Sequence, residues 1–378
     1  MSFNKSYNTY KKKFSYNNLP FNEHTTKSEK YPYFIVIPVY NEINYIVNTL
    51  QSINHQNQDL LDKTLIILVI NNSNTSKPEI ITSNYNTHQK ITEKKYNFEY
   101  IILDYYSVDN AISEKYFGVG LARKIGLDFA LHYSYENRLL FCLDADTLID
   151  KNYLKIIIQY YIKNNFSVTT INFQHQLSSD PIINKGIQIY EEALKDISSK
   201  IRSCNSPYGY VSMGSAIVCN AASYVAVGGM SKKKAAEDFY FLQSLAKYTK
   251  IHHIQEILVF PSSRNEERVH LGTGYRMNEY HLNNSFKNLF FTDESYYIIK
   301  KVICLFENHY HQSYECINKE LNKHFSNNIC NFLYEHKIEN VWDKINSNSK
   351  TKNQFITFFH QWFDALKIMK LLKYISQG

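Results

Sequence analysis

The sequence predicts an α/β fold in which helices cover both faces of a largely parallel, Rossmann-like sheet. Three observations lead to this prediction. From residue 33 onward, short apolar runs alternate with stretches of helical periodicity. The runs are continuous rather than alternating, which is typical of strands buried on both faces of a sheet. Little chain lies between the elements, and this rhythm is characteristic of parallel strands joined by crossover helices.

The first half of the chain contains four expected strands. The first, residues 33–37, leads into Pro38 to Glu42, and Asn41 is a plausible N-cap for a helix whose apolar residues follow at helical spacing. The other strands are expected at residues 65–70, 98–103 and 139–143, with helices from about residue 120 and over residues 153–161.

The second half has a looser pattern. Strands are expected over residues 166–173 and 213–219, with helices around residues 187–201 and 235–248, and the chain becomes helical from about residue 283. We therefore expect three parts: a polar N-terminal tail over residues 1–32, an α/β domain over residues 33–282 and a helical C-terminal region over residues 283–378.

Composition limits the partners and the location. The formal net charge is +7, but basic runs such as Lys11 to Lys13 are short and form no concentrated stripe, so no nucleic-acid partner is expected. The longest aliphatic run in the first half, residues 65–70, is far below the roughly 20 residues of a membrane span. The first 30 residues show no signal-peptide pattern, and the cysteines show no CxxC pair. These features favour a cytoplasmic protein, with peripheral contact at the inner face of the membrane left open.

Polar residues follow three of the four strands, at the sheet edge where ligands bind in open α/β folds. The most informative are Asp144 and Asp146, two carboxylates at positions i and i+2 just after an apolar strand. On an extended chain they project to the same side, where a hard cation such as Mg²⁺ or Mn²⁺ would relieve their repulsion and bridge a diphosphate. The competing interpretation is a surface turn or a helix N-cap.

A second acidic pair, Glu237 and Asp238, stands at the start of an expected helix. The helix dipole favours acids at this position, and this alone would explain the pair. The alternative interpretation is functional: a carboxylate held at the helix start could deprotonate a hydroxyl nucleophile.

Together these motifs resemble family 2 glycosyltransferases with the GT-A fold. The resemblance covers roughly residues 33 to 250 and is carried by five motifs in the family's order: residues 33–56, 71–73, 118–126, 143–147 and 237–238. It implies transfer of a sugar, of the hexosyltransferase type, from a nucleotide diphosphate sugar to a hydroxyl acceptor (a glycan, a lipid or a small molecule). It also implies inversion at the anomeric carbon and dependence on Mn²⁺ or Mg²⁺.

The resemblance also implies residue roles. Pro38, Tyr40 and Glu42 match the loop around the base and ribose, and Asn72 stands where the family usually has an Asp that contacts the base. Arg123 matches the arginine after the third strand. Asp146 matches the metal ligand, Asp144 the nearby ribose or metal contact, and Asp238 the catalytic base. Burial and the neighbouring Glu237 are expected to raise the pKa of Asp238.

A third cluster follows residue 260. Arg264, Arg268 and Arg276 are candidates for contacting the diphosphate, and His270 is the nearest candidate for a further metal ligand. An ordinary polar loop is the alternative.

Two alternative functions remain beside this one. A sugar-1-phosphate nucleotidyltransferase would need a Gly-rich loop after the first strand, but Pro38 to Glu42 contains no glycine. A GT-A-like binding module without catalysis is disfavoured by the two retained acidic pairs but favoured by Asn72. The sequence does not indicate the sugar, the base, the acceptor or the oligomeric state.

Overall fold

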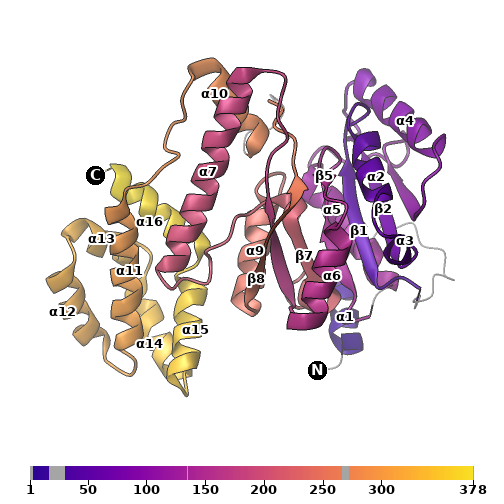
Figure 1. The fold of residues 1–378 in the computed structure, drawn as a ribbon. Coiled ribbons are helices and arrows are strands. Elements are labelled where there is room, and N and C mark those ends of the chain that lie inside the picture. Colours follow the sequence, from indigo (N-terminus) through magenta and orange to yellow (C-terminus); the bar gives the residue numbers. More distant parts are fainter. Residues whose placement is uncertain (1–2, 17–29, 134, 266–271, 378) are drawn as a thin grey trace. The chain divides into compact units, whose positions relative to one another are not determined.

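The computed structural model describes residues 3–16, 30–133, 135–265 and 272–377 (Figure 1). The chain forms two compact units. Unit 1 comprises Met1–Glu191 and Ser212–Ser285, and unit 2 comprises Glu192–Val211 and Phe286–Gly378. The predicted α/β class is confirmed: unit 1 contains an eight-stranded sheet together with helices.

Four parallel strands form one half of the sheet. They are β1 (Tyr33–Val39), β2 (Thr64–Asn71), β3 (Glu99–Tyr105) and β4 (Leu139–Cys142), in the spatial order β3-β2-β1-β4. The register pairs Tyr33 with Thr64 and with Leu139, so these strands begin level with one another. All four strands lie where the apolar runs predict them.

The other half of the sheet is mixed. Strand β7 (Ile217–Asn220) runs antiparallel to β4 and to β6 (Val168–Phe173), β8 (Ile251–Phe260) is parallel to β6, and the short β5 (Leu148–Ile149) completes the edge. The strand expected over residues 213–219 is corrected, because a 3-10 turn occupies Gly214–Ala216 and the strand begins only at Ile217. Strand β8 was not predicted.

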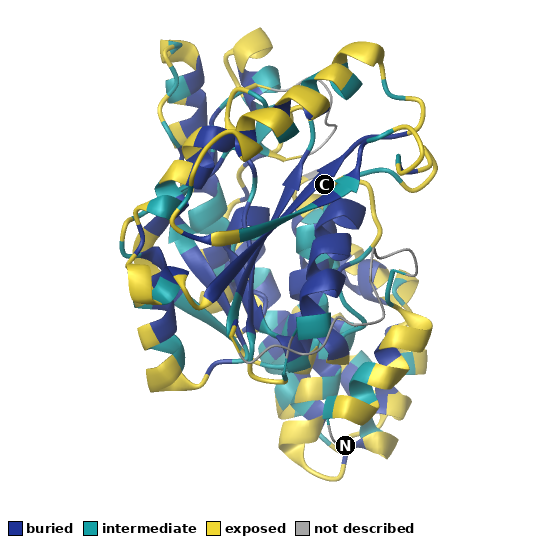
Figure 2. Ribbon diagram, turned by 90° about the vertical axis from the view of Figure 1, so that its right-hand side faces the viewer, coloured by how far each residue is buried: buried dark blue, intermediate teal, exposed yellow. Residues whose placement is uncertain are grey.

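The core lies along the central strands, which are drawn as buried in Figure 2. Helix α5 (Val119–Tyr133) packs on β1 and β2, and Gly120 to Leu131 are all buried. This helix is therefore buried on all sides over these residues. The other helices of unit 1 are α2 (Ile46–Asn54), α3 (Gln58–Leu61), α4 (Pro78–Thr92), α6 (Tyr153–Asn164), α8 (Ala221–Ala226), α9 (Glu237–Tyr248) and α10 (Thr273–Asn283).

The start of α2 corrects the predicted N-cap. Asn41 does not cap the helix, which begins at Ile46 after Tyr45. Instead, Asn41 adopts a left-handed conformation (φ 58°) and its backbone N–H donates to Asn84 Oδ1 at 2.9 Å. This local turn brings Glu42 into the protein, where it is 6% exposed.

Within the N-terminal part of the chain, residues 3–13 form a helix. Helix α1 (Phe3–Lys13) packs beside α8 and buries Tyr10. The Tyr10 hydroxyl accepts from Lys124 Nζ at 2.7 Å and donates to Asp128 Oδ1 at 2.5 Å. Lys11 to Lys13 are exposed at the end of this helix.

Unit 2 is helical, as the sequence predicts for the C-terminal region. It contains α11 (Asp293–Asn308), α12 (Tyr314–His324), α13 (Asn327–Glu335), α14 (Ile338–Asn348), α15 (Lys352–Trp362), α16 (Ala365–Gln377) and the second part of α7 (Pro181–Ser203). Its core is aromatic: the Phe306 ring lies 5.4 Å from Trp342 and 4.9 Å from Phe359, measured between ring centroids.

Two further properties follow from the described residues. None of their helices combines the length and the apolar character that a membrane crossing needs. Four of the six cysteines are buried, and the other two, Cys304 and Cys316, are partly exposed on unit 2.

Candidate functional site

The carboxyl ends of β1, β2 and β4 meet at one edge of the sheet in unit 1. The Asn71 side chain, at the end of β2, donates to Val39 O at 3.0 Å. The Thr49 hydroxyl, on α2, donates to Ala145 O at 2.8 Å. These bonds join the end of β2 to the end of β1 and helix α2 to the loop after β4.

The acidic pair after β4 does not stay extended. The chain turns, with Thr147 N donating to Asp144 O at 3.2 Å. As a result, the Asp144 and Asp146 carboxylates pair with different arginines: Asp144 with Arg123 and Asp146 with Arg264. The expectation that both project to one side of an extended chain is therefore wrong, although the Asp144 charge still raises the pKa of Asp146.

Arg123 joins the two acidic motifs. Its guanidinium, on the first turns of α5, forms ion pairs with both Asp144 and Glu237. It is 1% exposed, and a Cβ added at Gly214 would lie 2.7 Å from its Nη2, so glycine is needed for the close approach. The two carboxylates keep the pKa of Arg123 above its usual value despite its burial. A fully buried charge is tolerated only when paired in this way.

Asp238 follows Glu237 on the first turn of α9. Burial is the main cause that raises its pKa to about 7, with the Glu237 charge adding to the rise and Arg123 opposing it. The direction agrees with the sequence-based expectation. Tyr190 on α7 lies close enough to Asp238 and Arg276 for both charges to shift its pKa.

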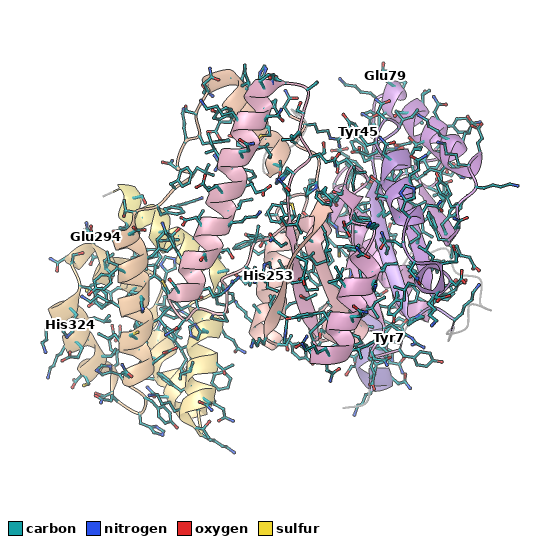
Figure 3. All side chains as sticks on the ribbon, viewed as in Figure 1. Tyr7, Tyr45, Glu79, His253, Glu294 and His324 are labelled. Atoms are coloured by element: carbon teal, nitrogen blue, oxygen red, sulfur yellow. The ribbon has the colours of Figure 1, made fainter. Side chains whose placement is uncertain are left out.

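The carboxylates of Asp146 and Glu42 both pair with the guanidinium of Arg264. Arg264 Nη2 lies 3.1 Å from Asp146 Oδ2 and 2.6 Å from Glu42 Oε1, and the guanidinium stands 4.2 Å from the centroid of the Tyr45 ring. Tyr45 is labelled in Figure 3. Burial raises the pKa of Asp146 to about 7, while Arg264 lowers it. The loop after β8 thus reaches the loop after β1, a contact between residues 222 positions apart.

Asn72 is buried and hydrogen-bonded within the protein. Its Oδ1 accepts from Asn84 Nδ2 at 3.0 Å and its own Nδ2 donates to Ser73 O at 3.1 Å. Nearby, Pro38 is buried at the end of β1, and the partly exposed Tyr40 ring lies 5.0 Å from the Phe117 ring, measured between centroids.

The remaining predicted site residues are Arg276, Arg268 and His270. Arg276 lies on α10 and pairs with Glu279 at 2.6 Å. Arg268 and His270 lie outside the described residues.

Among the residues at the site that were not predicted, Gln176 and Asn84 hold loops in place. Gln176 Nε2 donates to Asp146 O at 2.9 Å and to Phe260 O at 2.7 Å, which fixes the turn after β4. Asn84 links the loops after β1 and β2. Neither stands in a recognisable motif, so only the fold could reveal them.

The oxygen donors present fit a hard divalent cation in part. Asp146 and Glu42 already converge on one positively charged atom, and carboxylate oxygens are the ligands that Mg²⁺ and Mn²⁺ prefer. Asp144 is committed to Arg123. The described part of the chain holds no group of three or more His, Cys, Asp or Glu side chains arranged to bind a metal.

Comparison with known proteins identifies the family of the chain. The model of glycosyl transferase family 2 matches residues 34–222, half of the chain. No curated protein matches the sequence.

Similar solved structures include S. aureus TarS 1–349 in complex with UDP-GlcNAc, with 14% identity, 92% of each chain covered and a TM-score of 0.43. Mannosyltransferase PcManGT from Pyrobaculum calidifontis, in complex with GDP-Man and Mn²⁺, has 12% identity, 95% coverage of each chain and a TM-score of 0.42. A second TarS 1–349 structure matches over 61% of this chain and 60% of that chain, with 14% identity and a TM-score of 0.41.

Proposed function

The chain belongs to glycosyltransferase family 2, and from this premise we propose that it is an inverting, metal-dependent enzyme of the GT-A type. It transfers a sugar from a nucleotide diphosphate sugar to a hydroxyl acceptor. The observation that carries this proposal is the ion-pair network Asp144–Arg123–Glu237, which brings the acidic motif after β4 next to the acidic motif of α9.

Asp238 is the base in this proposal. With a pKa of about 7, the Asp238 carboxyl is about half ionised at neutral pH and mostly ionised slightly above it. The ionised carboxylate can accept the proton of the attacking hydroxyl. Glu237 is held by Arg123, so Asp238 is the member of the pair left for proton transfer. A base on the face opposite the leaving diphosphate leads to inversion.

The diphosphate of the donor is assigned to the part of the site that contains Asp146 and Glu42. Asp146 and Glu42 would hold Mn²⁺ or Mg²⁺, which when bound stabilises the negative charge that develops on the leaving diphosphate. Arg264 and Arg276 are the described arginines proposed to face the phosphates. Pro38, Tyr40 and Asn72 are assigned to the nucleoside.

The test is nucleotide release from UDP-, GDP- and dTDP-sugars with Mn²⁺ or Mg²⁺. We expect Asp238→Asn and Asp146→Asn each to lower kcat at least about a hundredfold, the usual scale for a general base or a charge-stabilising group. The control is Asp109→Asn, because Asp109 is exposed on the loop after β3. Turnover of both variants within about threefold of wild type would contradict the assigned mechanism. A donor that binds without turnover in the wild type would instead indicate a binding module.

A further inference from the structure

Two arginines at this site each bridge a pair of carboxylates, but their surroundings differ. The Arg123 side chain is 2% exposed, and its guanidinium lies close against the backbone at Gly214. The Arg264 side chain is 18% exposed, pairs with Glu42 and Asp146, and lies over the ring of Tyr45, a residue that is itself exposed. Arg123 is therefore built into the core of unit 1, whereas the Arg264 side chain is partly open to solvent.

We infer that Arg264 is an exchangeable counter-ion that competes with the divalent cation for Asp146 and Glu42. This inference rests on the proposed function and adds to it the sequence in which Arg264 changes its partners as the metal and the donor bind. Before the donor binds, Arg264 neutralises part of the charge of the two carboxylates. When the metal and the nucleotide diphosphate bind, the guanidinium moves from the carboxylates to the diphosphate.

The charges explain why the displacement of Arg264 by the metal is coupled to the binding of the nucleotide. Asp146 and Glu42 together carry two negative charges when ionised, and Arg264 supplies one positive charge to both through a single nitrogen. A metal that binds alone must displace Arg264 and leave its charge without these partners, which costs free energy in a partly buried site. A diphosphate provides a new bidentate partner for the guanidinium. Metal and nucleotide should therefore strengthen each other's binding, and by thermodynamic linkage each does so by the same factor.

The experiment measures metal binding without turnover. Free Mn²⁺ is followed by electron paramagnetic resonance during titrations of the full chain, alone and with saturating UDP or GDP. In Arg264→Gln we expect Mn²⁺ alone to bind about five- to tenfold more tightly than in wild type, a coupling of ordinary allosteric size. UDP or GDP without metal should bind more weakly to this variant, and the effect of nucleotide on Mn²⁺ affinity should shrink.

Two matched variants separate competition from a general charge effect. Arg138→Gln removes the same charge at the opposite end of β4, where Arg138 lies over Tyr135. Arg264→Lys keeps the charge but loses the planar, forked arrangement of donors of the guanidinium. We expect Arg138→Gln to leave Mn²⁺ affinity within about twofold of wild type and Arg264→Lys to be intermediate.

The outcomes are distinguishable. If Mn²⁺ alone binds Arg264→Gln no more tightly than wild type, or if Arg138→Gln has the same effect, the inference is wrong, even when nucleotide and metal bind as the proposed function requires. If Mn²⁺ binding tightens but neither UDP nor GDP binds any variant, competition at the carboxylates stands and the proposed donor class fails. Thermal unfolding of each variant shows whether it is folded.

Discussion

Asp238 is the residue whose environment makes the clearest prediction for catalysis. The charged groups around it are Glu237, Arg123 and Asp144, with Tyr190 from α7 nearby. Its pKa of about 7 predicts that kcat rises with pH to a plateau slightly above neutrality. Below pH 7 we expect kcat to fall about tenfold per pH unit, since only the ionised form accepts a proton. A pH–rate profile at saturating donor measures this, and a flat profile between pH 5 and 8 would contradict the role of Asp238.

The same shift predicts how the stability of the protein depends on pH. The folded pKa of Asp238 lies above the value of about 3.9 expected in the unfolded chain. Protonated Asp238 therefore favours the folded state, and this contribution is lost as the pH rises from about 4 to about 7. Asp238→Asn should be more stable than wild type at pH 8, by up to about 4 kcal/mol, and nearly equal to it at pH 4. Urea unfolding at the two pH values tests this; a destabilised variant at pH 8 would show that the carboxylate is favourable when folded.

Gly214 allows a separate test of the Arg123 network. A methyl group at this position would lie 2.7 Å from Arg123 Nη2, so Gly214→Ala must push the guanidinium away from Asp144 and Glu237. We expect a loss of about 2 to 4 kcal/mol in unfolding free energy, because a buried ion pair is weakened while its charges stay buried. Equal unfolding free energies for Gly214→Ala and wild type would contradict the tight packing.

At the level of secondary-structure elements, α1 makes a prediction of its own. Asp128 accepts hydrogen bonds from Tyr10 and from Tyr224, and it pairs with Lys124 at 3.0 Å. Tyr10→Phe removes one donor from this buried carboxylate and one acceptor from the buried Lys124. We expect a loss of about 1 to 3 kcal/mol, the cost of leaving buried polar groups without partners.

Its control is Tyr85→Phe, which removes the hydroxyl of a tyrosine that is 53% exposed. Urea unfolding that is unchanged in Tyr10→Phe would show that α1 contributes little to the stability of unit 1.

The elements also show how far the sequence could be interpreted. Continuous apolar runs identify β1, β2 and β4, because strands buried on both faces need no polar alternation. Helix α1 could not be predicted, since its sequence is mostly polar and its packing depends on Asp128, which is 118 residues from Tyr10.

For the site, the sequence indicated the motifs but not their partners. Arg123 lies 21 residues from Asp144 and 114 from Glu237, so only the folded chain brings the three together. The turn after β4 was missed for a related reason: the backbone there is held by Gln176, which lies 30 residues from Asp146.

At the scale of the whole molecule, the two units are interleaved in sequence. Residues 192–211 belong to unit 2, where the Tyr208 hydroxyl donates to His360 O at 2.6 Å and Lys200 pairs with Asp293 at 2.8 Å. A chain truncated after residue 285 would keep this segment but lose those partners. We expect the truncated chain to bind a hydrophobic dye and to unfold at a lower temperature than the full chain. Thermal unfolding as cooperative and as stable as that of the full chain would contradict the assignment of residues 192–211 to unit 2.

The distribution of cysteines has a consequence for thiol chemistry. Cys142 and Cys219 lie on strands in the core of unit 1, and burial raises the pKa of Cys142 to about 12, so almost no reactive thiolate forms there at neutral pH. Cys304 and Cys316, the partly exposed thiols, both belong to unit 2. An alkylating dye or a mild oxidant will therefore modify the helical unit first. The unmutated chain thus carries its own attachment points for a spectroscopic label, on the unit that does not contain the proposed sugar-transfer site.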